Sequence, residues 1–454
     1  MKKIVTLILT ASLLCTVLCA AAAALTGDVN SDGQLNNKDV VALFRYVSGN
    51  KDAVKDVSAC DFNGDGEVDN KDVVAMFKAV STSDKKYEEA VLYPCNDVVN
   101  TLSAEQINKI EYFWITAGGR NTRHICPGES FQYLVYAGNR EEKYDPLNLS
   151  VKDVELKVTE GASHCRLTSN GVFTALSAGE VTVEATLKAD RSITYTSKIT
   201  IKDPEKLNVN YWKGSGTYFD PYIISTAEDF LNIAKICTFE YYNNDYQKGG
   251  HWFRQTADID LSGIDYEPPM YMLYNYDGGG HKISNVTVDS TCTETALFSI
   301  MMCRVIRDLT VENYTYKRNN TIEVGNTGVF AALAFSGEFL NCRAENIDID
   351  ISNNKEYSGW VGGFVCHCAE STYFANCSVS GKIKCDDQAG GFICFTESTA
   401  YNSLFSNCAA NVTVDGVGNE IGGFSSKKLP GSYLYNCTST QYDKTLEEKN
   451  IVTE

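Results

Sequence analysis

Two acidic segments near the start of the chain have the residue types and spacing of calcium-binding loops. Each is twelve residues long, with oxygen-bearing side chains at positions 1, 3, 5, 9 and 12 and glycine at position 6. Calcium takes about six to eight oxygen ligands, one of them the backbone carbonyl of position 7, and the glycine allows the sharp turn that lets them converge. We therefore predict two Ca²⁺ ions, one held by Asp28, Asn30, Asp32, Gln34, Asn36 and Asp39 and the other by Asp61, Asn63, Asp65, Glu67, Asp69 and Asp72.

These loops must be positioned by helices. The loops begin at Asp28 and Asp61, 33 residues apart, and each is followed by an apolar segment with helical spacing, residues 40–47 and 73–80. No helix is expected before either loop, unlike in an ordinary EF-hand. A solvated acidic turn is the alternative for a single loop, but the matched repeat argues against it. We expect a small α-helical module, an F-hand pair, over residues 25–81.

The duplicated loop and helix resemble the type I dockerin family, whose members bind cohesin domains on cellulosome scaffold proteins. The aspartate at position 12 (Asp39, Asp72) is shared with that family. The resemblance implies that the cohesin partner contacts loop positions 10 and 11 and the following helix, namely Asn37, Lys38, Arg45, Asn70, Lys71 and Lys78. The two halves match, so either is expected to face the cohesin after a half-turn. Many dockerins have Ser-Thr at these positions, so the cohesin class stays open, as does a merely solvated role for the lysines.

The first 24 residues predict export. Lys2 and Lys3 precede an apolar run over residues 4–19, and small residues follow at 20–24, which is the pattern of a cleaved secretory signal peptide. Leucine precedes both Cys15 and Cys19, which argues against a lipoprotein signal. We expect a secreted protein on an extracellular scaffold or cell surface, without membrane insertion. The net charge of −18 argues against nucleic acid and anionic membranes as partners.

Residues 82–108 are polar and predict a linker, and residues 109–203 alternate as short strands do. The run from Gly171 to Gly179 resembles group 2 bacterial immunoglobulin-like domains, which implies a β-sandwich. His124, Cys126, His164 and Cys165 leave three alternatives open: a zinc site, a Cys126–Cys165 disulfide or unlinked thiols. Of 17 cysteines, two lie in the signal peptide, and the pairing of the remaining 15 is open.

Residues 204–440 repeat a short unit, and residues 441–454 form a tail. A helix is expected from a capping box at residues 225–228 to about Cys237. After it, an element of two small residues and phenylalanine recurs at Phe298, Phe330, Phe364, Phe392 and Phe424, and Asn-Cys recurs at 341–342, 376–377, 407–408 and 436–437. Such repeats predict a parallel β-solenoid with an internal phenylalanine stack and an Asn-Cys ladder, in which Cys366 and Cys394 are neighbours. The region resembles GLUG-motif β-helices of bacterial surface proteins.

The fold class is therefore mainly β, with an N-terminal α-helical F-hand pair, a β-sandwich and a C-terminal parallel β-helix. Catalytic residues stay unassigned, because carboxylates such as Asp258, Asp260, Asp348 and Asp350 cannot be paired from the sequence and no His-Glu-x-x-His motif occurs. We expect the β-helix to recognise a glycan or a surface. The alternative is a polysaccharide lyase or glycoside hydrolase. Aromatic residues at the start of the β-helix either close its end or stack on sugars: Tyr211, Trp212, Tyr218, Tyr241, Tyr242, Tyr246 and Trp252.

Overall fold

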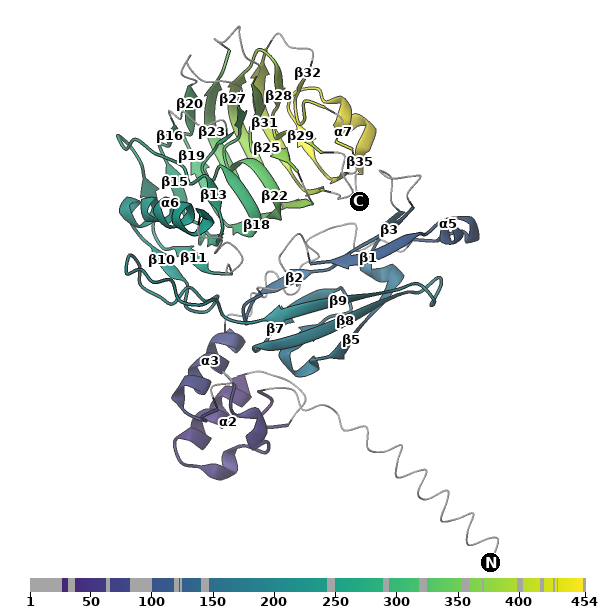
Figure 1. Cartoon of the computed structure of the whole chain (residues 1–454), viewed down its shortest axis with the longest axis vertical. Coiled ribbons are helices and arrows are strands. Elements are labelled where there is room, and N and C mark those ends of the chain that lie inside the picture. Colours follow the sequence, from purple (N-terminus) through teal and green to yellow (C-terminus); the bar gives the residue numbers. More distant parts are fainter. Residues whose placement is uncertain are drawn as a thin grey trace, which may run out of the picture.

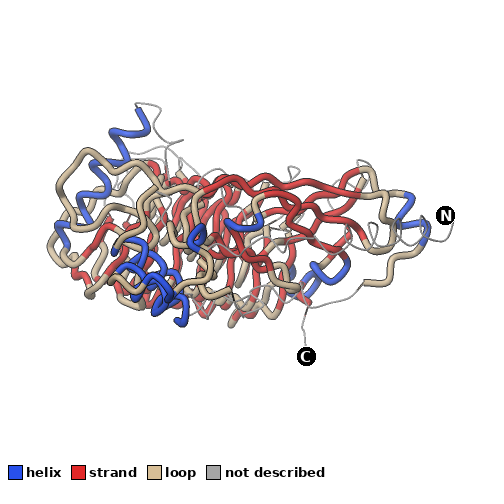
Figure 2. The backbone as a smooth tube through the Cα atoms, turned by 90° about the horizontal axis from the view of Figure 1, so that it is seen from below, coloured by secondary structure: helices blue, strands red, loops and turns tan. Residues whose placement is uncertain are grey.

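The structure of the chain is a computed structural model (Figure 1). It describes residues 27–31, 37–62, 66–81, 100–117, 122, 125–139, 147–242, 250–288, 294–317, 325–352, 359–369, 371–397, 403–416, 420–427, 429–430 and 432–451. The predicted signal peptide lies outside these residues. Figure 1 shows a helical part, a part made of antiparallel strands and a C-terminal solenoid, and Figure 2 shows that strands dominate the tube. The predicted mainly β fold class with N-terminal helices and a C-terminal solenoid is confirmed.

The helical part consists of two helices that each follow one predicted calcium loop. They are α2 (Asn37–Val47) and α3 (Asn70–Ser81), with the short 3₁₀ helices η1 (Lys51–Ala53) and η2 (Val57–Ala59) between them. Its small core includes Val29, Leu43, Cys60, Phe62 and Met76. The residue after the first loop position, Val29 or Phe62, is buried in this core, so the start of each loop is anchored to the helices.

Three small antiparallel sheets form the middle part around one hydrophobic core that includes Phe131, Tyr133 and Phe173. In spatial order, the first sheet contains β1 (Tyr112–Thr116), β3 (Leu134–Gly138) and β4 (Leu147–Leu149). The second contains β2 (Ser130–Gln132), β7 (Val172–Ala175) and β6 (Cys165–Leu167). The third contains β5 (Val154–Glu160), β8 (Gly179–Leu187) and β9 (Thr194–Ile201). Along β8, Val181, Val183 and Ala185 alternate toward the core, as the sequence pattern predicts.

The segment predicted as an irregular linker differs from that prediction at its C-terminal end. Residues Ala104–Asn108 form helix α5, whose N-terminus is stabilised by a capping box between Ser103 and Gln106. Asn100 donates from its backbone and its side chain to Asp153, at 2.8 and 2.7 Å. Leu102 packs against the middle core. The polar composition concealed a short capped segment that already belongs to the packing of the middle part.

The solenoid has three parallel sheets, which we call the long, second and short sheets. The long sheet contains β10 (Tyr222–Ile224), β11 (Trp252–Gln255), β13 (Tyr271–Met272), β14 (Asn275–Asp277), β18 (Ile300–Arg307), β22 (Ala331–Leu340), β25 (Val365–Cys368), β26 (Thr372–Ala375), β29 (Ile393–Thr396), β30 (Leu404–Ser406), β33 (Tyr433–Tyr435) and β35 (Asn450–Ile451). The second sheet contains β12 (Ile259–Asp260), β15 (Lys282–Ser284), β16 (Thr287–Val288), β19 (Thr310–Glu312), β20 (Thr315–Lys317), β23 (Arg343–Asp350), β27 (Ser378–Lys384), β31 (Ala409–Asp415) and β34 (Thr438–Ser439). The short sheet contains β17 (Glu294–Thr295), β21 (Asn326–Thr327), β24 (Trp360–Gly362), β28 (Gln388–Gly390) and β32 (Glu420–Gly422).

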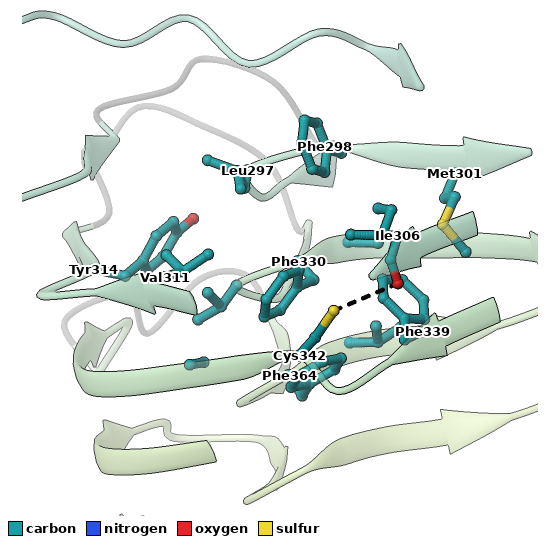
Figure 3. Packing of buried hydrophobic residues seen from close by; sticks show 14 of the residues in the cluster. Leu297, Phe298, Met301, Ile306, Val311, Tyr314, Phe330, Phe339, Cys342 and Phe364 are labelled. Atoms are coloured by element: carbon teal, nitrogen blue, oxygen red, sulfur yellow. Dashed lines mark hydrogen bonds between the residues drawn. The ribbon is translucent and has the colours of Figure 1, made fainter. Parts of the chain in front are cut away.

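The predicted phenylalanine stack fills the interior (Figure 3). Ring centroids are 4.4 Å apart for Phe330–Phe364, 4.8 Å for Phe364–Phe392 and 4.9 Å for Phe392–Phe424. The glycine before the aromatic residue is required by close approach of the next rung: a Cβ at Gly363 would lie 2.0 Å from the carbonyl oxygen of Gly391. A second stack, Phe339, Phe374 and Phe405, runs beside the first and was not predicted.

The predicted Asn-Cys ladder is also present. Asn341, Asn376, Asn407 and Asn436 all have positive φ, and each donates from Nδ2 to the side-chain oxygen one rung earlier, at 3.1–3.2 Å. Asparagine tolerates this left-handed conformation better than most residues. The neighbouring cysteine thiols are buried and donate to backbone carbonyls; Cys342, for example, donates to Ile306 at 3.4 Å (Figure 3). The paired register of Val365 with Ile393 makes Cys366 and Cys394 rung neighbours, as predicted.

Helices lie at both ends of the solenoid. Helix α6 (Ala227–Tyr242) is longer than predicted. The predicted capping box paired Ser225 with Glu228, whereas the capping hydrogen bonds in the structure join Thr226 and Asp229. Helix α7 (Lys444–Lys449) is capped by Asp443, which also accepts hydrogen bonds from the backbone of Phe424 and Ser425 at 2.8 and 2.7 Å. Among the described helices, none is long and apolar enough to cross a membrane.

The middle part covers the outer face of the long sheet. Leu134, Tyr136 and Cys126 of the middle part share one buried apolar cluster with solenoid residues that include Trp252 and Tyr373. Trp252 donates from Nε1 to the buried carboxylate of Glu129 at 2.6 Å. A Cβ at Gly128 would lie 2.3 Å from the ring of Phe219, so the backbone approaches the solenoid closely. The two parts are joined by a packed interface.

Candidate calcium site and docking surface

The first loop is described at its two ends. Asp28 and Asp39 are buried, with exposed fractions of 7 % and 0 %, and the backbone amide of Asn30 donates to Oδ1 of Asp39 at 3.2 Å. The hydrogen bond holds position 3 of the loop against position 12, at the start of α2. Asp32, Gln34 and Asn36 lie outside the described residues.

The second loop has a corresponding arrangement. The backbone amides of Phe62 and Asp69 donate to the two carboxylate oxygens of Asp72 at 2.9 and 2.8 Å. Asp61 accepts from the amide of Gly66 at 3.0 Å, and Gly66 has the positive φ expected of position 6. Asp72 is fully buried, whereas Glu67 is exposed. Asn63 and Asp65 lie outside the described residues.

The described atoms fit a hard cation. Asp39 and Asp72 are carboxylates with no exposed surface, and a buried carboxylate is costly unless it is paired or coordinates a metal. Within the described residues, the buried Nδ2 of Asn30 makes no hydrogen bond, so no protein partner fixes that end of the amide. The donors are all oxygens, which calcium prefers. The same carboxylates stand in the first turn of α2 and α3, so a bound ion would fix both helices.

The residues predicted to contact a partner lie on these two helices. Lys38 and Arg45 are exposed on α2, and Asn70 and Lys71 are exposed on α3. Nζ of Lys71 lies 3.4 Å from a carboxylate oxygen of Asp69 and 4.0 Å from one of Glu67. Both ion pairs are exposed and therefore weak. The backbones of Asn37 and Lys78 are helical, but their side chains are not among the described ones.

An exposed apolar pair on each helix was missed in the sequence. Val41 and Phe44 of α2 are 47 % and 54 % exposed, and Val74 and Phe77 of α3 are 51 % and 53 % exposed. The two pairs are separated by the same 33 residues as the loops. Matching apolar residues at equal exposure are more than scattered surface residues, and they mark two equivalent surfaces. The signal was available, because Val-x-x-Phe recurs in both helices, but helical periodicity alone assigns such residues to the core.

The comparison with known families falls on these loops and helices. Residues 26–81 match the dockerin type I domain. Dockerins of this type generally bind calcium, and the domain implies a cohesin-binding, cellulosome-type component. No curated protein matches the chain. A crystal structure from Bacteroides ovatus, provisionally named an immunoglobulin A1 protease, is 20 % identical over 52 % of this chain and 80 % of that one, with a TM-score of 0.37. That likeness is too distant to support an argument.

Outside the dockerin, two of the candidate carboxylates, Asp260 and Asp348, are too far apart to act as a glycosidase pair. Asp260 lies on β12 and Asp348 on β23, three strand spacings apart, or about 14 Å. Hydrogen bonds from Asn285 and Ser262 lower the pKa of Asp260 to about 2, and hydrogen bonds from Lys282 and His281 lower the pKa of Asp258. A general acid needs a raised pKa, so neither residue has the protonation state for that role at neutral pH.

The possible zinc ligands and disulfide of the middle part are also separated. Cys126 lies in the cluster shared with the solenoid, while Cys165 lies in the core of the middle sheets, and both are free thiols. His164 pairs with Ser177 through Nδ1 at 3.0 Å, and His124 is outside the described residues. In the part of the chain that the structure describes, no three histidine, cysteine, aspartate or glutamate side chains are grouped so that they could hold a metal ion.

The aromatic residues at the start of the solenoid have two different environments. Trp212 donates to the backbone of Asp229 in α6 at 2.9 Å and packs edge-on against Phe253, so it closes the end of the solenoid. Trp252 and Tyr218 are instead buried under the middle part. They are therefore unavailable for stacking on sugars. The side chains of Tyr241, Tyr242 and Tyr246 are outside the described ones, and Tyr211 is exposed.

Proposed function

We propose that the chain is a secreted component of an extracellular cellulosome-type scaffold, attached through its dockerin to a cohesin. The single observation that carries this proposal is the duplicated surface of the dockerin. On α2, Lys38, Val41 and Phe44 are exposed, and on α3, Lys71, Val74 and Phe77 are exposed at positions 33 residues later. An apolar centre beside basic residues suits a protein partner with an apolar patch and acidic rim.

Two calcium ions, as the loop pattern predicts, would hold this surface in shape. The buried carboxylates of Asp39 and Asp72 stand at the beginning of α2 and α3, and the loops that precede them supply the other ligands. Calcium supplies the charge that offsets these buried carboxylates. The chain's own residues then make the contact with the partner, Asn37, Lys38 and Arg45 in one orientation and Asn70, Lys71 and Lys78 in the other.

The test is binding of the full chain to a panel of cohesins by calorimetry. Phe44→Ala and Phe77→Ala singly should each retain binding within about threefold, because the other face remains. The double variant should lose at least about 100-fold, which corresponds to removal of an interface anchor from both orientations. Strong loss from one single variant would contradict two equivalent faces. Unchanged binding of the double variant, or binding that survives EDTA, would contradict the proposal itself.

For the solenoid we propose recognition of a glycan or a surface. The separation of Asp260 from Asp348 and the lowered pKa values of Asp258 and Asp260 support binding over hydrolysis at those carboxylates. The competing function is a polysaccharide lyase or glycoside hydrolase. Incubation of the chain with plant and mucin glycans distinguishes them, because released reducing ends or unsaturated products would establish catalysis.

A further inference from the structure

An aromatic and polar cluster lies on the solenoid where the short sheet meets β25 and β29. We call its members Trp360, His367, Gln388, Phe395 and Glu397 the Trp360 cluster. Trp360 and Gln388 are paired neighbours on β24 and β28, and His367 and Phe395 are paired neighbours on β25 and β29. The ring of Trp360 meets that of Phe395 edge-on at 4.9 Å, while His367 stacks on Phe395 at 4.1 Å. Two sheets thus contribute to one cluster.

Two buried polar atoms of this cluster make no hydrogen bond within the described part of the chain. They are Nε2 of His367, whose residue is 7 % exposed, and Oε1 of Gln388. The nearest carboxylate oxygen of Glu397 is 3.3 Å from Nε2 of His367 but is not aligned for a hydrogen bond. Burial lowers the pKa of His367 to about 4, so the imidazole is neutral near pH 7 and the pair is not an ion pair.

Leaving a buried polar atom unpaired is costly, so two such atoms in one cluster with an aromatic pair call for an explanation. In the Trp360 cluster, the two unpaired atoms occur together with the half-buried rings of Trp360 and Phe395 and the exposed carboxylate of Glu397. An aromatic surface with a few convergent polar groups is the usual composition of a site for a small organic ligand. None of its members belongs to the apolar cluster that the middle part and the solenoid share.

We propose that the Trp360 cluster binds a neutral sugar residue of a glycan chain. The apolar face of a pyranose packs on an aromatic ring, and its hydroxyl groups both donate and accept hydrogen bonds. They would donate to Oε1 of Gln388 and to the carboxylate of Glu397, and complete the bonding of Nε2 of His367. Uronic acids and sulfated sugars are disfavoured, because Glu397 and the chain's net charge of −18 repel them. This inference rests on the glycan recognition proposed for the solenoid.

Calorimetry on the full chain with cellohexaose, xylohexaose, mannohexaose and trigalacturonic acid tests the site. At least one neutral hexaose should bind and trigalacturonic acid should not. Trp360→Ala should weaken that binding by about 10-fold or more, and Gln388→Ala by about threefold to 10-fold. Tyr195→Ala is the matched control, because Tyr195 is an aromatic residue 37 % exposed on β9 of the middle part, and its loss should leave binding unchanged. Circular dichroism checks that each variant is folded.

The outcomes separate the site from the broader proposals. Binding of a neutral hexaose that is unchanged in both Trp360→Ala and Gln388→Ala overturns the Trp360 cluster while glycan recognition stands. Absence of binding to all three neutral hexaoses overturns the cluster and counts against glycan recognition by the solenoid, but leaves the cohesin interaction unaffected. Preferential binding of trigalacturonic acid overturns the assignment to neutral sugars. If Trp360→Ala fails to fold, Gln388→Ala and Glu397→Ala decide the question.

Discussion

The hydroxyl groups of Tyr136 in the middle part and Tyr373 in the solenoid are hydrogen-bonded, with 3.2 Å between their oxygens. They are 237 residues apart in the sequence, and both are buried in the cluster that joins the two parts. Tyr373 faces outward on β26, while the next residue, Phe374, faces the solenoid core. The middle part therefore supplies a cover for an apolar column of the long sheet that would otherwise meet water.

Glu129→Ala should loosen this interface. The buried carboxylate accepts from Nε1 of Trp252 at 2.6 Å and from the amide of Cys126 at 3.1 Å, so its removal leaves both donors unpaired. We expect a loss of about 2–3 kcal/mol in the free energy of unfolding, measured with urea. Glu129→Gln, which keeps an oxygen acceptor, is the matched control and should lose less. Equal losses for the two variants would count against the hydrogen bonds as the cause.

The stability of the solenoid should depend on pH through Asp277. Burial would raise the pKa of this carboxyl, but Arg307 at 2.8 Å and Arg254 at 3.2 Å outweigh burial and lower it. Because the folded-state pKa is below the unfolded value of about 3.9, the stabilisation is present above that value and is lost as the pH falls through the folded-state pKa. Thermal unfolding between pH 7 and pH 2 should show this loss. Asp277→Asn should reduce the slope in that range, and an unaltered slope would exclude Asp277 as its source.

Asn376 should stabilise the ladder in two separable ways. Its Nδ2 donates to Asn341 and its Oδ1 accepts from Asn407, both at 3.1 Å, and its φ is 55°. Asn376→Ala loses both hydrogen bonds and places alanine, which tolerates the left-handed conformation less well than asparagine, at this position, for a loss of about 2–3 kcal/mol. Asn376→Gly loses only the hydrogen bonds, and we expect about 1 kcal/mol in urea unfolding. If glycine is no better than alanine, backbone conformation contributes nothing.

The ladder cysteines should resist thiol reagents in the folded protein. Cys342, Cys377, Cys408 and Cys437 are free and buried, and burial raises the pKa of the Cys342 and Cys408 thiols. Because all four side chains are buried, the reagent cannot reach them in the folded protein, so labelling with Ellman's reagent should be slow under native conditions and complete in guanidinium. Mass spectrometry of peptides assigns the sites. Rapid native labelling of Cys377 or Cys408 would show that the solenoid opens locally at these rungs.

The repeats were readable because every rung pairs and packs in the same way against the rungs before and after it. Phe364 and Phe392 stack because a repeat of constant length returns equivalent residues to the same place on the next rung. The capping of α6 was misplaced because Ser225, Thr226 and Asp229 all carry capping side chains, and only the helix geometry selects among them. The short helix in residues 104–108 was missed although Ser103 and Gln106 have the spacing of a capping box, because the polar composition of the segment indicates a linker.

By itself, the sequence determined the duplicated module with its paired helices and the repeated rung of the solenoid, since these depend on residues close together in the chain or at a constant spacing. Only the tertiary structure decided which aromatic residues are accessible. Trp252 is buried by the middle part, Trp212 closes the end of the solenoid, and Trp360 remains half-exposed beside two unpaired polar atoms. These outcomes depend on contacts between side chains of different structural elements, and no local pattern specifies such contacts.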